Sequence, residues 1–139
     1  MESTPGEVVG HKVRFDELIT KTTRIKYITD GMLIREAISD PELKSYSVII
    51  LDEAHERTIN SDVLLALVKR ITKARGRKLS IVVMSATLEL VKFQRYFSDI
   101  QAICPSSVIN IEGRTFPIEI YHTLETQDDY VTCVVNSVI

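Results

Sequence analysis

The sequence predicts an α/β fold built on a parallel sheet, and three observations support this prediction. A short apolar run at residues 47–51 ends abruptly in Asp52 and Glu53, which is typical of a strand buried on both faces. Residues 79–84 form a second apolar run of the same kind, and the stretch between the runs has apolar positions at helical spacing. Strand, helix and strand in this order predict a βαβ unit with two parallel strands.

Composition restricts the class of protein. The chain has 139 residues, of which 45% are hydrophobic, and this is enough for one domain with its own core. No apolar run is long enough to span a bilayer, and the N-terminus lacks the features of a signal peptide. Cys104 and Cys133 form neither a disulfide framework nor a metal-ligand motif. We therefore expect an intracellular protein that does not enter a membrane.

The net charge of -2 argues against a generally basic nucleic-acid-binding protein, but the basic residues lie in two groups. We interpret the first group as a candidate phosphate-facing stripe. The second group falls on a predicted helix end, where cations oppose the negative end of the helix dipole, so we favour a solvated face there. The first group is Lys12, Arg14, Lys21, Arg24, Lys26 and Arg35, and the second is Lys69, Arg70, Lys73, Arg75, Arg77 and Lys78.

The N-terminal third predicts two strands and a helix. Residues 13–15 and, more clearly, 24–29 are short strand candidates. Thr29 or Asp30 can cap a helix that Pro41 ends. The predicted apolar positions of this helix are Leu33, Ile34, Ala37 and Ile38.

The helix between the two apolar runs is expected to be capped by Asn60 or Ser61 and to end at Gly76. Residues 90–97 have the spacing of another helix, and residues 130–138 fit an amphipathic helix whose β-branched content leaves a strand open. The central helix has its predicted apolar face at Leu64, Leu67, Val68 and Ile71, and further short strand candidates are residues 102–104, 108–111 and 118–121.

The predicted βαβ unit gathers reactive groups at one edge of the sheet. Parallel strands end at the same edge and lie about 4.8 Å apart, so residues 52–55 should face residues 85–87 across a crevice. Carboxylates, an imidazole and hydroxyls together can position a metal ion and a water. Taken singly, each group has a simpler interpretation as a loop or helix cap. A zinc-protease helix is excluded because the second histidine would fall on Ile59.

At these residues the chain resembles the DEAH-box RNA helicases of helicase superfamily 2. Asp52-Glu53-Ala54-His55 matches the motif that names the family, and Ser85-Ala86-Thr87-Leu88 resembles its SAT motif. Thr29-Asp30-Gly31-Met32-Leu33 is similar to its RNA-contacting TDG motif. Residues 9–15 are similar to the segment before that motif, and residues 112–117 resemble the end of the first RecA-like domain.

The resemblance implies a role for each matching residue. Asp52 would bind Mg²⁺ through a water, and Glu53 would act as base toward the attacking water and could also face the ion. His55 would contact the second RecA-like domain and sense the nucleotide state. Ser85 and Thr87 would couple hydrolysis to strand separation. The expected RNA contacts are Thr29, Asp30 and Gly31, with Arg14 added from its charge and position alone.

For Asp30 the physics is mixed, because a carboxylate repels phosphate. We favour a capping role for its side chain, while Gly31 and nearby amides approach the RNA. For Arg14 the alternative is a plain surface cation.

A phosphate-binding loop is missing from the sequence. No Gly-Lys-Ser or Gly-Lys-Thr occurs in it, whereas such loops provide most of the binding of a triphosphate. We therefore predict an incomplete RecA-like (P-loop NTPase) domain that lacks the phosphate-loop strand. Residues 1–117 would be part of the first RecA-like domain, and residues 118–139 would begin the second.

The function that follows is that of a fragment of an ATP-dependent RNA helicase, with ATP, Mg²⁺ and RNA as ligands of the complete parent. The chain alone is expected to be inactive. The alternatives are a regulatory chain that binds RNA or a helicase partner without hydrolysis, and an unrelated Mg²⁺-dependent α/β hydrolase. The resemblance also suggests G-patch-type or ribonucleoprotein partners and a nuclear or nucleolar location for the parent.

Overall fold

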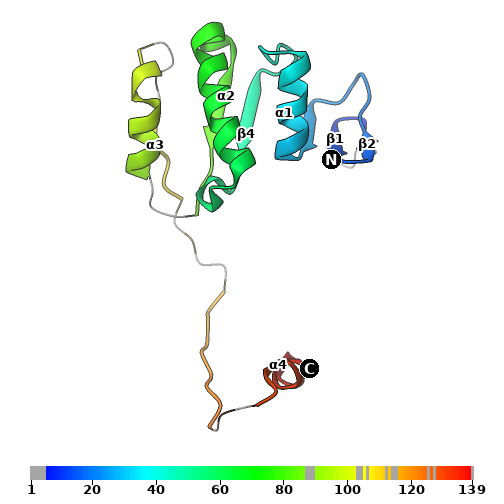
Figure 1. Cartoon of the computed structure of the whole chain (residues 1–139), viewed down its shortest axis with the longest axis vertical. Coiled ribbons are helices and arrows are strands. Elements are labelled where there is room, and N and C mark those ends of the chain that lie inside the picture. Colours follow the sequence, from blue (N-terminus) through cyan, green and yellow to red (C-terminus); the bar gives the residue numbers. More distant parts are fainter. Residues whose placement is uncertain are drawn as a thin grey trace. The chain divides into compact units, whose positions relative to one another are not determined.

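The computed structural model describes residues 6–86, 90–102, 105, 107–111, 113, 116–124, 126 and 128–138. It divides into two compact units, Met1–Val108 and Ile109–Ile139, which are described separately. The predicted α/β class with parallel strands is confirmed in the first unit, where helices α1, α2 and α3 stand side by side and strand β4 lies behind α2 (Figure 1).

The first sheet, sheet A, has the strand order β2-β1-β3. Its strands are β1 (Val9–Val13), β2 (Asp16–Leu18) and β3 (Ile25–Ile28); β1 is antiparallel to β2 and parallel to β3. Only Val13 of the strand predicted at residues 13–15 lies in a strand, because Phe15 has a φ of 69° and forms the turn of the β1–β2 hairpin. Gly10 is required in β1, since a Cβ there would lie 2.4 Å from the Leu18 carbonyl oxygen.

Helix α1 (Asp30–Ser39) begins and ends where the sequence predicts. Thr29 is its N-terminal flanking residue, and its carbonyl accepts from the amides of Met32 and Leu33, but its side chain makes no cap hydrogen bond. Ile38 is 76% exposed, so the predicted apolar face is wrong at that position. The predicted positions Leu33 and Ala37 are confirmed, because both are buried in the core.

The predicted βαβ unit is confirmed. Strands β4 (Val48–Leu51) and β5 (Ser80–Val83) pair in parallel as sheet B, with Val48 opposite Ser80 and Leu51 opposite Val83. Between them lie the short 3₁₀ turn η1 (Ala54–Glu56), helix α2 (Ile59–Arg75) and the turn η2 (Gly76–Lys78).

The start of α2 differs from the prediction, and its end does not. Thr58 is the cap in place of Asn60 or Ser61: its Oγ1 accepts from the Ser61 amide at 3.1 Å. Gly76 ends the helix with a φ of 59°, a conformation that favours glycine. The cap therefore lies two or three residues closer to the Asp52–His55 loop than the sequence predicts.

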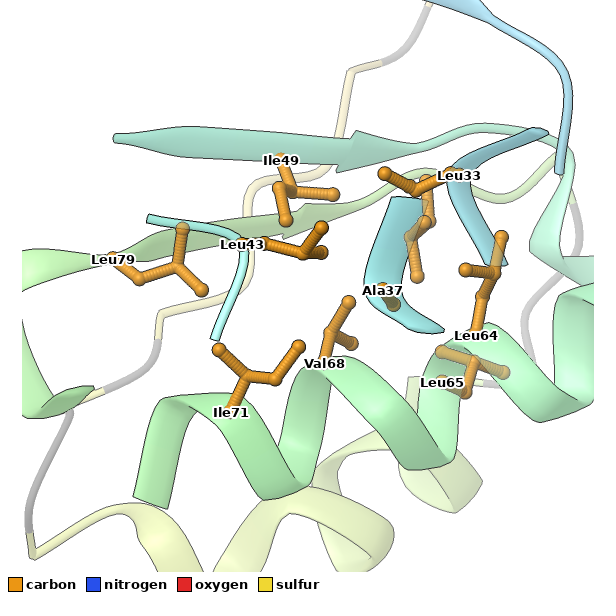
Figure 2. Packing of buried hydrophobic residues seen from close by; sticks show 10 residues of the cluster. Leu33, Ala37, Leu43, Ile49, Leu64, Leu65, Val68, Ile71 and Leu79 are labelled. Carbon is orange, nitrogen blue, oxygen red and sulfur yellow. The ribbon is translucent and has the colours of Figure 1, made fainter. Parts of the chain in front are cut away.

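The hydrophobic core lies between sheet B and the helices α1 and α2, as Figure 2 shows. Only one face of sheet B is covered by the described residues: Ile49 is 4% exposed, whereas its neighbour Ile50 is 58% exposed. The expectation of a strand buried on both faces is therefore wrong for β4 in this chain. The core residues are Leu33, Ala37, Leu43, Ile49, Leu51, Leu64, Leu65, Val68, Ile71 and Leu79.

Helix α3 (Leu90–Phe97) confirms the predicted helix there, and the turn η3 (Ser98–Ile100) follows it. In the second unit, α4 (Tyr130–Val138) is helical, and Asp129 accepts from the amides of Val131 and Thr132 at its start. The predicted strands at residues 108–111 and 118–121 do not form, and residues 103 and 104 of the remaining candidate lie outside the described residues. No helix in the described part of the chain could cross a membrane.

Candidate functional site

The loops after β4 and β5 are joined by backbone hydrogen bonds. The Met84 amide donates to the Leu51 carbonyl at 2.8 Å, and the Ala54 amide donates to the Met84 carbonyl at 3.0 Å. The pairing of the strands thus continues beyond sheet B into the two loops that carry the candidate chemistry. Glu53 adopts a left-handed conformation with a φ of 51°, which turns the chain into η1 and leaves both carboxylates exposed.

His55 sits between the two loops. Its Nδ1 lies 3.3 Å from the Ala86 amide nitrogen and 3.3 Å from Glu53 Oε2. A neutral ring with its proton on Nε2 accepts from Ala86 through Nδ1, whereas a protonated ring donates from Nδ1 to the Glu53 carboxylate. The side chain is 24% exposed, so the loops hold it while one edge of the ring stays accessible.

The predicted meeting of the two loops is therefore confirmed for the residues that the structure describes. Asp52, Glu53 and His55 meet the segment of Ser85, whose side chain is half-buried, while Thr87 lies outside the described residues. Asp52 Oδ1 accepts from the Glu53 amide at 2.8 Å, which fixes its carboxylate at the edge of the sheet. Among the described residues no group of three or more histidine, cysteine or acidic side chains is arranged as a closed metal site.

This donor set still fits Mg²⁺. Mg²⁺ keeps several waters and is usually held in nucleotide sites by one or two carboxylates together with substrate phosphates. Asp52 and Glu53 are exposed carboxylates on adjacent residues, and neither forms part of the buried core. A protein cage is not required for this kind of site.

The candidate RNA residues lie at the edge of sheet A where parallel strands β1 and β3 end. The Thr29 amide donates to the Lys12 carbonyl at 3.4 Å, so Arg14 and Thr29 both follow strands that end side by side. A Cβ added to Gly31 would meet only Asn60 Nδ2, at 3.9 Å, among its surroundings. The fold therefore does not require glycine at position 31 for space. Because Gly31 has no side chain, its backbone is open to a ligand.

Two of these residues have partners within the chain. The Arg14 guanidinium lies over the Phe15 ring, with Cζ 4.8 Å from the ring centroid. The predicted capping role of the Asp30 side chain at α1 is wrong. Asp30 is the first residue of the helix, and its Oδ2 accepts a hydrogen bond of 3.1 Å from Ser61 Oγ on α2.

Comparison with known proteins assigns these motifs to a family. No protein-family model matches the chain. The chain is 46% identical over 137 residues to the human ATP-dependent RNA helicase DHX33, a match that covers 96% of the chain. The chain belongs to the DEAH-box helicase family. The crystal structure of the Escherichia coli DEAH/RHA helicase HrpB matches 96% of this DEAH-box chain with a TM-score of 0.74 and 31% identity.

These relatives are much longer than the DEAH-box chain. It spans 18% of the human protein and 17% of the bacterial one. In the bacterial helicase the match falls on part of a RecA-like domain, which agrees with the predicted fold class.

The DEAH-box chain also contains a polar cluster that the sequence did not indicate. Glu36 on α1 accepts hydrogen bonds from Lys26 Nζ at 2.9 and 3.0 Å and from the Tyr46 hydroxyl at 2.5 Å, and Lys12 Nζ lies 3.4 Å away. We call Lys12, Lys26, Glu36 and Tyr46 the Glu36 cluster. It joins β1 and β3 to α1 and to the segment before β4, and so holds sheet A in place.

Protonation in the Glu36 cluster follows from burial and hydrogen bonding. Burial opposes the charge of Glu36, but the Tyr46 hydroxyl and the Lys26 ammonium outweigh it and hold the pKa of the carboxyl below its usual 4.5. Burial, followed by the hydrogen bond to Glu36, raises the pKa of the Tyr46 hydroxyl well above 10.0. The carboxylate therefore stays ionised and the phenol neutral over the physiological range.

The Glu36 cluster changes the interpretation of the first basic group. Lys12 and Lys26 are 23% and 18% exposed and are engaged with Glu36, so they do not form an open stripe. The exposed cations that remain in this group are Arg14, Lys21, Arg24 and Arg35.

The second basic group has a structural role at three of its positions. Lys69 and Lys73 bind Asp99 at 2.9 and 2.7 Å and so fasten η3 to α2. The Arg75 guanidinium donates to the Leu43 carbonyl at 2.7 Å. Lys73, and then Lys69, lowers the pKa of the Asp99 carboxyl to about 2.

Proposed function

We propose that this chain is the part of an ATP-dependent RNA helicase that carries the hydrolysis loop and one RNA-contacting loop. The observation that carries the proposal is the bonded pair of loops at the edge of sheet B, in which the Ala54 amide donates to the Met84 carbonyl at 3.0 Å. The similarity to the human ATP-dependent RNA helicase and to the bacterial DEAH/RHA helicase supports it.

In the proposed reaction a water attacks the γ-phosphorus of ATP, and the bond from this phosphorus to the bridging oxygen breaks. Glu53 takes the proton that the water loses, and its exposed carboxylate at the sheet edge suits this role. Asp52 would hold Mg²⁺ through a water, with Glu53 as a neighbouring carboxylate, and the ion when bound supplies neutralisation of the phosphate charge.

His55, Ser85 and Thr87 are proposed to connect hydrolysis to movement. His55 would contact the second RecA-like domain, and its position between Glu53 and Ala86 lets it respond to both loops. Ser85 and Thr87 would transmit the change along the segment after β5.

RNA is proposed to bind at the edge of sheet A. Thr29, Gly31 and neighbouring amides at the start of α1 would contact the RNA backbone, because the positive end of a helix attracts phosphate. Arg14 would add a phosphate contact from the adjacent strand end. Asp30 would act indirectly, since its carboxylate is engaged by Ser61.

The organisation of the parent is part of the same proposal. Residues 1–117 would belong to the first RecA-like domain, and residues 118–139 would start the second. ATP and Mg²⁺ would be its cofactors, G-patch-type or ribonucleoprotein partners would bind it, and it would act in the nucleus or nucleolus.

A segment exchange with the human relative tests this function. We expect the relative to keep RNA-stimulated ATP hydrolysis when its matching segment is replaced by this chain, and Glu53→Gln in that segment to lower the rate by about 10²–10⁴-fold. Phosphate release with and without single-stranded RNA is the measurement. Glu56→Gln is the matched control, because Glu56 is an exposed acid in the same loop and should leave the rate unchanged.

The 139-residue chain alone should release no phosphate above background. RNA-stimulated release by the chain alone that Glu53→Gln abolishes would contradict this expectation. An active exchange protein that Glu53→Gln leaves unaffected would contradict the assignment of the base.

A second candidate function is a regulatory chain that binds RNA or a helicase partner without hydrolysis. It is favoured by the exposed cations Arg14, Lys21 and Arg24 of the first basic group, which could contact phosphate without hydrolysis. Salt-dependent RNA binding by the chain that Arg14→Gln weakens, together with an inactive exchange protein, would select this function.

A further inference from the structure

The first turns of α1 and α2 are tied together by side-chain hydrogen bonds. Ser61 Oγ donates to Asp30 Oδ2 at 3.1 Å, and the same Ser61 oxygen lies 2.5 Å from Thr58 Oγ1. The Ser61 amide also donates to Thr58 Oγ1 at 3.1 Å. Ser61 is thus shared between the cap of α2 and the candidate RNA-contacting loop.

The direction of each hydrogen bond is fixed by the number of protons. An ionised carboxylate only accepts, so the Ser61 hydroxyl gives its single proton to Asp30. The short contact between the hydroxyls must then be donated by Thr58, whose oxygen accepts from the Ser61 amide at the same time. The result is one directed series, from the Thr58 hydroxyl through the Ser61 hydroxyl to the Asp30 carboxylate.

Thr58 is held close to the candidate hydrolysis loop. The Glu56 amide donates to the Glu53 carbonyl at 3.0 Å, and Arg57 adopts a left-handed conformation with a φ of 51° directly before the cap. Arg57 then binds Asp62 through two hydrogen bonds of 2.7 and 3.0 Å. A hydrogen-bonded turn and an ion pair therefore lie along the short segment from Glu53 to Thr58.

The surroundings of Asp30 explain why a carboxylate is tolerated in a loop that is expected to contact phosphate. It lies in the first turn of α1 and accepts from the first turn of α2, so the positive ends of both helices stabilise its charge. Behind it, Leu33 and Leu64 belong to the shared core, which keeps the two helices in fixed register. The hydroxyl pair therefore joins the two loops at the ends of helices that share one core.

From this arrangement we infer that Ser61 is a positioning residue that couples the candidate RNA loop at Thr29–Gly31 to the candidate hydrolysis loop at Glu53–Arg57. The inference rests on the proposed function only for the identity of the ligand, RNA. Ser61 lies outside the five segments that carry the family resemblance.

Amide hydrogen exchange of the 139-residue chain tests the inference without RNA. Asp30→Ala and Ser61→Ala should each speed exchange at the Glu56 amide, and the double variant should be no faster than the faster single one, because one link is removed in all three. Ser61→Thr keeps the hydroxyl and should preserve the slow exchange. Ser39→Ala, at the exposed end of α1, is the matched serine control.

Adding a single-stranded oligouridine completes the test. RNA should slow exchange at residues 29–31 and should also slow it about fivefold at Glu56 in the wild type and in Ser61→Thr, but not at Glu56 in Ser61→Ala. Protection of residues 29–31 without any effect at wild-type Glu56 would overturn the inference, and so would additive effects of the two single variants. RNA that protects neither loop would contradict the proposed RNA contact alone, because the variants decide the coupling by themselves.

Discussion

Sheets A and B of the first unit are held in place by different forces. Sheet B rests on α2 through hydrocarbon: Ile49 and Leu51 are buried, together with Leu64 and Val68 of the helix. Sheet A contributes no fully buried apolar side chain among its described strand residues, although Ile28 packs partly buried against the core. The Glu36 cluster joins this sheet to α1. Sheet B, with the candidate hydrolysis loop at its edge, is thus supported mainly by apolar packing, and sheet A mainly by charge.

This difference matters because the two kinds of support respond to different changes. Apolar packing is weakened by cavities and is almost independent of salt and pH. An ion-pair cluster is weakened by neutral substitution and by titration of its members. Each force can therefore be removed separately, and the response of each sheet can be measured.

The largest effect is expected from two neighbouring isoleucines of β4. Ile49→Ala should lower the free energy of unfolding by about 2–5 kcal/mol, because it leaves a cavity against α2. Ile50→Ala on the exposed face should change it by about 0.5 kcal/mol or less. Urea unfolding followed by circular dichroism measures both, and the lower strand propensity of alanine affects the two variants equally.

Equal losses for the two variants would mean that both faces of β4 are covered in solution. In that case the one-sided burial of sheet B, and with it the contrast between the sheets, would be wrong. Leu64→Ala serves as a second core variant, because it lies on α2 and does not alter a strand.

An intermediate effect is expected at the Glu36 cluster. Glu36→Gln should lower the free energy of unfolding by about 1–3 kcal/mol, since it removes the charged partner of Lys26 and leaves part-buried donors less well satisfied. Amide exchange should rise first in β1 and β3, and not in β4. Glu42→Gln is the matched control, because Glu42 forms only an exposed pair with Lys44, at 3.6 Å.

A loss at Glu36 no larger than the loss at Glu42 would remove the Glu36 cluster as the support of sheet A. Faster exchange in β4 and β5 together with β1 and β3 would show that the two sheets open as one unit. Both results would replace the comparison of two separate supports with a single cooperative core.

Part of this organisation was predictable from sequence, and the reason is periodicity. The βαβ unit, the end of α2 at Gly76 and the meeting of the Asp52–His55 and Ser85 segments follow from local pattern and strand direction. The Glu36 cluster was not predictable, because its members come from four separate segments and have no characteristic spacing. The contact of Ser61 with Asp30 was missed for the same reason, and the cap at Thr58 was overlooked because several cap residues stand in a row.

The smallest expected effect is the pH dependence that belongs to Glu36. Its pKa is lower in the folded chain than the ordinary 4.5, so its contribution to stability is complete above that pH. The contribution is lost as the pH falls through the lower folded value, because the unfolded chain then binds more protons. Wild type and Glu36→Gln should therefore differ most near neutral pH and converge in acid, as measured by urea unfolding at several pH values.

The difference in unfolding free energy between wild type and Glu36→Gln separates the titration of Glu36 from that of the other acids. Asp62, Asp99 and Asp129 also have lowered pKa values, but they titrate equally in both chains and cancel. Tyr46 has the opposite effect on stability at alkaline pH. Its pKa is raised above 10.0, so its stabilising contribution is present below that pH and is lost as the pH rises further. Curves that remain parallel from neutral to acid pH would show that Glu36 supports sheet A by its shape and not by its charge.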